Sequence, residues 1–153
     1  MFILLAFTSI EGLEAKTFGA KLDKSQWYLS ASIFECSLVH EIPYYGKGMF
    51  YHEAGEELKF ITSAVQNPMK PGKAALVIEA SSWKPGNVIQ DLGYVDVIDS
   101  TKPIVVKKKN ATAMMTGLLA GMAPTFTRKA WYDDDSIRIY INSIHFRSVY
   151  EGY

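Results

Sequence analysis

Hydrophobic and polar side chains alternate along much of the chain with a period of two, the spacing of a half-buried β-strand. The clearest case is SIRIYINSI near the end, where Ile137, Ile139 and Ile141 fall on one side and polar residues on the other. We therefore predict a strand over residues 136–144 with the three isoleucines facing the core.

Earlier runs follow the same pattern and are separated by turn residues at short intervals. Phe34, Cys36, Leu38 and His40 share one face of such a run, which ends at Pro43. The other predicted strands cover residues 27–31, 49–52, 58–65, 75–80, 88–97 and 104–106. A hairpin turn is predicted at residues 54–56.

One segment departs from this period. NATAMMTGLLAGM, residues 110–122, has apolar residues at helical spacing, so we predict a helix there. Asn110 or Thr112 is expected to cap its start and Gly121 to end it. Gly117 in the middle weakens the helix by about 1 kcal/mol relative to alanine.

Seven or eight short strands with one such helix indicate a mainly β fold. We predict an antiparallel β barrel or sandwich with one or two short helices packed on it. The chain has 153 residues, which is the size of a single domain.

The N-terminus begins with MFILLAFTSI, an apolar run too short to span a bilayer, followed by Leu13-Glu14-Ala15. This arrangement is typical of a secretory signal, so residues 1–15 are predicted to be a signal peptide and the protein to be exported. The positive n-region is missing, since no Lys or Arg precedes Lys16. Either the true start lies upstream, or the run is a buried N-terminal strand.

Charge and motifs exclude several classes of function. Lys and Arg together number 16, as do Asp and Glu, so no net field attracts nucleic acid. The chain lacks G-x-S-x-G, G-x-G-x-x-G, Walker and H-E-x-x-H motifs. We therefore expect no enzyme activity and no cofactor.

The spacing of the histidines, the acidic run and the cysteine does not indicate a metal site or a catalytic site. His40, His52 and His145 lie far apart in the sequence, and Asp133–Asp135 lacks the pattern of a calcium loop, so no metal is expected. Cys36 and His40 on one strand would lie about 13 Å apart, too far for a catalytic dyad.

Aromatic residues make up 13% of the chain and are the most prominent remaining feature. Those in predicted loops are candidates for contact with a partner, because buried rings mostly serve the core. The candidate interface residues are Tyr44, Tyr45, Trp83, Lys107, Lys108 and Lys109. The lysine run is more typical of a solvated loop or of an edge strand protected by lysines than of a binding site.

Several stretches occur together and in a fixed order: SQWYLSASIFECSLVHEIPYYG, FYHEAG, SSWKPG, MMTGLLAGMAPTFT and SIRIYINSIHF. As a set, from about Ser25 to Tyr150, they resemble the N-terminal domain of the MotY family, flagellar motor proteins of sodium-driven polar flagella. The resemblance assigns residues 16–153 to that β domain. The second, OmpA-like domain of the family, which holds peptidoglycan, is absent from this sequence, so the chain is either a fragment or a stand-alone relative.

The resemblance implies a structural role in the periplasm. The expected partners are a MotX-like protein and the flagellar basal body, in a ring that supports stator assembly. The alternative is an exported β-barrel module that binds a small apolar ligand, which requires an apolar cavity of roughly 300 Å³ or more.

Cys36 is the only cysteine, which is unusual for an exported chain. Family members carry a second cysteine shortly after the segment that matches the end of this sequence. The resemblance therefore implies that Cys36 forms a disulfide with a partner beyond Tyr153. The alternative is a buried, inert thiol.

Overall fold

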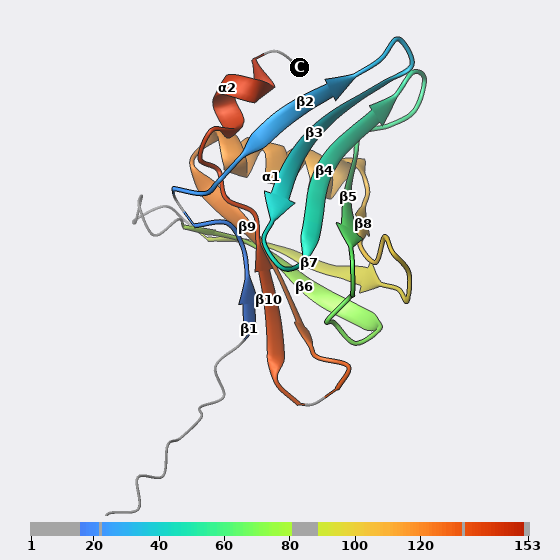
Figure 1. Ribbon diagram of the computed structural model, residues 1–153, viewed down its shortest axis with the longest axis vertical. Helices are drawn as coiled ribbons and strands as arrows, with labels where there is room; N and C mark the ends of the chain where they lie inside the picture. Colours follow the sequence, from blue (N-terminus) through green and yellow to red (C-terminus); the bar gives the residue numbers. More distant parts are fainter. Residues whose placement is uncertain (1–15, 22, 81–88, 133, 152–153) are drawn as a thin grey trace, which may run out of the picture.

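The computed structural model describes residues 16–21, 23–80, 89–132 and 134–151. This part of the chain forms two five-stranded sheets in a sandwich-like arrangement, with two short helices (Figure 1). The prediction of a mainly β domain is confirmed, in the form of a sandwich, because the described strands do not close into a barrel. The predicted signal segment, residues 1–15, lies outside the described residues.

One sheet is entirely antiparallel. Its strands, in spatial order, are β2 (Trp27–Ala31), β3 (Glu35–Ile42), β4 (Gly46–Glu53), β5 (Lys59–Ala64) and β8 (Val105–Val106). The turn between β4 and β5 lies where it was predicted, and Gly55 adopts a φ of 80° there. A residue without Cβ is favoured at such an angle.

The other sheet has one parallel pair. In spatial order it contains β1 (Lys16–Phe18), β10 (Ser136–Tyr140), β9 (Met122–Lys129), β6 (Gly72–Ala80) and β7 (Gln90–Val97), and β1 runs parallel to β10. Ile137, Ile139 and Ile141 are completely buried, which confirms the predicted register. The strand ends at Tyr140, earlier than predicted, and a short helix α2 (Phe146–Tyr150) follows.

Strand β9 was not predicted, because Gly121 and Pro124 were interpreted only as signals that end a helix. The carbonyl oxygen of Pro124 accepts a hydrogen bond from the Ile141 amide at 2.9 Å, just past the last residue of β10. The N–H and C=O of one strand residue point toward the same neighbouring strand, so the N–H that proline lacks would also point toward β10. The pairing of β9 with β10 already ends at this position. A proline is therefore tolerated in a central strand.

Helix α1 (Lys108–Leu119) begins two residues before the predicted start. The predicted capping by Asn110 or Thr112 is wrong, since Lys107 is the N-cap and provides no side-chain hydrogen bond. Gly121, with a φ of 79°, follows the C-cap as expected, and its amide donates to the Leu118 carbonyl at 3.1 Å. The helix packs against β9 and β5, one strand from each sheet.

Aromatic side chains fill the space between the sheets. The ring centroids of Phe50 and Phe60 lie 5.0 Å apart, and Phe60 stacks on Phe126 of the other sheet at 6.0 Å. All three side chains are fully buried. An interior packed in this way offers no support for the alternative of an apolar ligand held inside a barrel.

The N-terminal and C-terminal segments lie side by side, at the left of Figure 1. The Trp27 indole donates to the Asn142 carbonyl at 2.8 Å, and the Asn142 side-chain amide in turn donates to the Ala20 carbonyl at 2.9 Å.

None of the described helices is long and apolar enough to cross a membrane.

Candidate interaction surface

The turn between β3 and β4 points two neighbouring tyrosines in opposite directions. Tyr44 has a left-handed backbone, with a φ of 64°, and its side chain is 98% exposed. Tyr45 is only 1% exposed, so its predicted place on an exposed loop is wrong. The turn directs its ring inward against Phe18, at 6.1 Å between centroids.

Burial of Tyr45 is compensated by one hydrogen bond. Its hydroxyl donates to Thr62 Oγ1 at 3.0 Å. Removal from water raises the pKa of the Tyr45 phenol to about 12, with the bond to Thr62 acting weakly in the opposite direction. Tyr45 therefore anchors the turn that presents Tyr44 to solvent.

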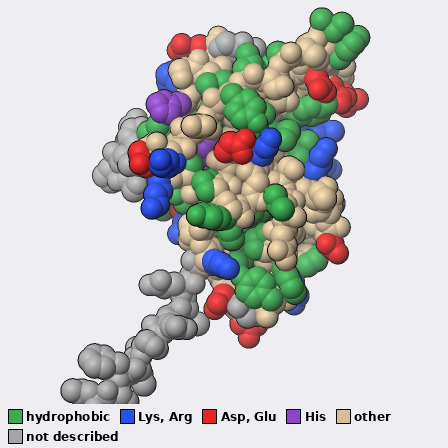
Figure 2. All heavy atoms as spheres, viewed as in Figure 1, with side chains coloured by type: hydrophobic (Ala, Val, Ile, Leu, Met, Phe, Trp, Pro, Cys, Tyr) green, Lys and Arg blue, Asp and Glu red, His purple; other side chains and the backbone are tan. Residues whose placement is uncertain are grey.

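Tyr44 belongs to a larger exposed cluster, which we call the apolar end surface: Tyr44, Val65, Trp131 and Tyr132. The Val65 amide donates to the Tyr45 carbonyl at 3.1 Å, which holds Val65 beside the turn. Trp131 and Tyr132 meet edge to face at 5.4 Å. Figure 2 shows hydrophobic side chains at this lower end of the molecule, near the start of β1 in Figure 1.

A hollow of about 500 Å³ lies between three of these residues, Tyr44, Trp131 and Tyr132. Its lining includes Tyr44, Trp131, Tyr132, Pro68 and Lys16. The Lys16 ammonium lies 5.7 Å from the centre of the Tyr132 ring, within range of a cation–π interaction. Exposed Trp and Tyr side chains around a hollow are typical of protein contact sites.

The sequence predicted only one member of this surface. Val65, Trp131 and Tyr132 were not predicted as surface residues, and Val65 was placed at the end of the predicted strand over residues 58–65. An aromatic pair directly before an acidic run, WYDDD, was the available signal.

The predicted lysine run is exposed but lies apart from this surface. Lys107, Lys108 and Lys109 stand at the start of α1, with no acidic residue in the first helical turn. Positive charge at a helix N-terminus opposes the helix dipole, so this run does not stabilise the helix. Trp83, the other predicted interface residue, lies outside the described residues.

Cys36 is partly exposed on β3, where it pairs with Ala31 of β2 and His52 of β4. Residues two apart on a strand share a face, so Cys36 shares its face with His40 and with Trp27, the partner of His40. Trp27 contacts Phe146 of α2 at 4.8 Å on that face. The last described helix therefore packs on the side of the sheet toward which Cys36 points.

The three histidines lie in different parts of the fold. His40 is buried, His52 is exposed on β4, and His145 precedes α2 with a φ of 70°. Within the described ranges, no three His, Cys, Asp or Glu side chains come together as metal ligands would.

Comparison with known proteins agrees with this picture of a structural β domain. The family model "MotY N-terminal domain" matches residues 18–153. A curated relative, "Sodium-type flagellar protein MotY" of Vibrio parahaemolyticus serotype O3:K6 (strain RIMD 2210633), is 26% identical over 145 residues. The match covers 90% of this chain and 48% of that protein, so the chain spans about half the length of its relative. Because the family model matches most of its length, the chain belongs to the MotY N-terminal domain family.

Proposed function

We propose that this protein is a periplasmic structural component of a sodium-driven polar flagellar motor. Membership of the MotY family, a family of structural motor proteins rather than enzymes, carries the proposal. Its partners are a MotX-like protein and the basal body, in a ring that supports stator assembly. Anchoring to peptidoglycan is assigned to the OmpA-like domain of the family.

The apolar end surface supports a role in protein contact, and Tyr44 is the most informative residue. A bulky residue in the left-handed region costs roughly 1–3 kcal/mol, and such strain concentrates at functional sites. Because Tyr44 is 98% exposed, packing contacts do not offset this conformational cost. Tyr44 is therefore proposed to contact a partner, with the lysines at 107–109 as a second, separate contact.

Cys36 is proposed to form a disulfide with a cysteine located after Tyr153. The support is that α2 packs on the face of the sheet that Cys36 shares with Trp27. A bridge that closes a loop of more than 100 residues stabilises by up to about 4–5 kcal/mol in the chain-entropy model. A non-reducing peptide map of protein taken from the periplasm would contain the linked peptides, whereas a free Cys36 thiol there would contradict the pairing.

The motor role is tested by deleting the gene in its own bacterium. The deletion strain is expected to assemble a filament but not to swim. Restoring the gene with Tyr44→Asn is expected to leave swimming impaired although the protein is stable. Asparagine tolerates the left-handed backbone, so the free energy of unfolding rises by up to about 1 kcal/mol.

Tyr94→Asn is the matched control, because Tyr94 is also a well-exposed tyrosine but lies on β7, outside the apolar end surface. This variant is expected to restore swimming fully. Normal swimming of the deletion strain would refute the motor role, and normal swimming with Tyr44→Asn would refute only the contact assigned to Tyr44.

A further inference from the structure

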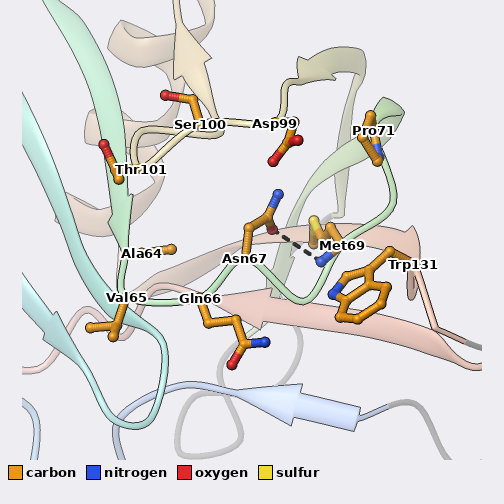
Figure 3. A pocket seen from close by; sticks show the side chains of 10 residues that line it. All are labelled: Ala64, Val65, Gln66, Asn67, Met69, Pro71, Asp99, Ser100, Thr101 and Trp131. Atoms are coloured by element: carbon orange, nitrogen blue, oxygen red, sulfur yellow. Dashed lines mark hydrogen bonds between the residues drawn. The ribbon is translucent and has the colours of Figure 1, made fainter.

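A second hollow lies against Trp131 and is distinct in its chemistry from the one beside Tyr44. It measures about 610 Å³ and is lined by residues 64–67, 69 and 71 at and after the end of β5, residues 99–101 before β8, and Trp131 after β9 (Figure 3). This volume lies within the range of sites for small ligands.

Polar side chains form one wall of this hollow. Asn67 Oδ1 accepts a hydrogen bond from the Met69 amide at 3.0 Å, which fixes the orientation of the Asn67 side chain. Its NH₂ group consequently points toward Asp99 (Figure 3). Ser100 Oγ accepts from the Lys102 amide at 3.1 Å, and Thr101 continues the same wall. The wall thus combines an amide donor, hydroxyl groups and one carboxylate acceptor.

The Trp131 indole provides an apolar wall. It is 56% exposed, so one part of the ring is open to a ligand while the rest is supported. Tyr132 packs edge-on against it at 5.4 Å, and the Trp131 amide donates to the Pro68 carbonyl at 3.3 Å. These contacts hold the ring in place before any ligand arrives.

The charge of the lining restricts the ligand. No Lys or Arg is among the described residues that line the hollow, and Asp99 is its one charged side chain. An anionic ligand would therefore be repelled and would find no cationic partner. A purely apolar ligand would leave the amide and the carboxylate without their hydrogen bonds to water.

A ligand with a flat C–H face and a rim of hydroxyl groups satisfies both walls. We propose that this hollow binds a neutral saccharide, with one pyranose ring stacked on Trp131. The ring hydroxyls then accept from Asn67 and donate to Asp99. The site shares Val65 and Trp131 with the apolar end surface but does not include Tyr44. It gives this β domain a sugar-binding activity in addition to the proposed motor contact.

The test is a titration of the ¹⁵N-labelled chain with two probes, tetra-N-acetylchitotetraose and cellotetraose. Either probe is expected to shift the amide resonances of residues 64–67, 69 and 99–101 and the indole N–H of Trp131. A response to the acetylated probe alone assigns the site to amino-sugar glycans, and a response to both assigns it to pyranose rings in general.

Variants locate the binding. Trp131→Ala is expected to weaken binding at least tenfold, and Asp99→Asn, which keeps the shape of the side chain, about threefold or more. Tyr94→Ala, an exposed aromatic substitution outside the hollow, is expected to bind like the wild type. The dispersion of the amide spectrum reports directly whether each variant is folded.

Three results would overturn the proposal. The first is an unchanged spectrum with both probes at about 10 mM, a concentration that would reveal even a millimolar Kd. The second is undiminished binding by both Trp131→Ala and Asp99→Asn. The third is broadening of the same resonances by a motor partner protein without any response to sugars, which would make the hollow part of a protein interface.

Discussion

His40 is buried in surroundings that keep its imidazole neutral. Its Nδ1 lies 2.9 Å from the Gln26 carbonyl, while Nε2 has no hydrogen-bond partner among the described residues. We therefore assign the proton to Nδ1, since an unpaired lone pair costs less than an unpaired N–H. The Trp27 indole stacks on the ring at 4.6 Å.

This burial makes stability depend on pH. Desolvation lowers the pKa of His40 from 6.5 to about 4, opposed by the hydrogen bond to Gln26. Between these values the unfolded chain binds a proton that the folded chain does not, so acidification favours unfolding. We expect the free energy of unfolding to fall by about 3 kcal/mol from this residue as the pH drops from 7 to 4.

Urea unfolding at several pH values checks the effect. His40→Phe keeps an aromatic ring against Trp27 but cannot titrate, so its stability is expected to fall less on acidification than that of the wild type. His52→Gln, at an exposed histidine, is the control and is expected to follow the wild type. An identical decline in all three proteins would contradict the assignment to His40.

At the scale of elements, the approach of α1 to the sheet depends on Gly117. A Cβ at this position would lie 2.8 Å from Cγ2 of Ile78 in β6, closer than real contacts allow. Ile78 is fully buried and its Cγ2 is attached directly to Cβ, so it cannot move aside. The glycine that weakens the helix locally therefore permits its packing.

We expect Gly117→Ala to destabilise the protein despite the better helix propensity of alanine. The gain of about 1 kcal/mol in propensity is outweighed by an overpacking cost of about 1–3 kcal/mol. Ile78→Ala opens the space that the new methyl group needs. In urea unfolding, the double variant should therefore lose less stability than the sum of the single variants, by about 0.5 kcal/mol or more. Strictly additive losses would contradict the proposed clash.

The periodicity of hydrophobic residues predicted those elements whose own sequence shows an alternation of buried and exposed positions. The isoleucines of β10 were placed correctly because one face of the strand is buried along its length. Strand β9 could not be predicted in the same way, since Pro124 is acceptable only where β10 stops pairing. The start of α1 was also misplaced, because no side chain caps it.

The candidate surface was less predictable than the fold. Tyr44 and Tyr45 are adjacent and chemically identical, yet the left-handed turn exposes one and buries the other. Trp131 joins Val65 only through the tertiary fold, since 66 positions separate them in the sequence (131 − 65). The sequence therefore shows that aromatic residues are abundant, but it does not show which of them lie on the same surface.

At the scale of the whole molecule, the described residues form a packed two-sheet unit, and the exposed side chains of the apolar end surface gather at one end of it. Its two terminal segments are tied together through Trp27, Asn142 and Ala20, so additional chain on either side would leave from a braced region. A packed interior and the apolar end surface are consistent with a component that positions other proteins.

The central claim is that this protein is part of the flagellar motor, and the most direct measurement is its retention on purified basal bodies. Basal bodies from cells that express the tagged full-length gene product are immunoblotted beside the same fraction from a strain without flagella. We predict a band in the first preparation, a weaker band with Tyr44→Asn and none in the strain without flagella. Equal bands from both strains, or no band on intact basal bodies, would contradict the account.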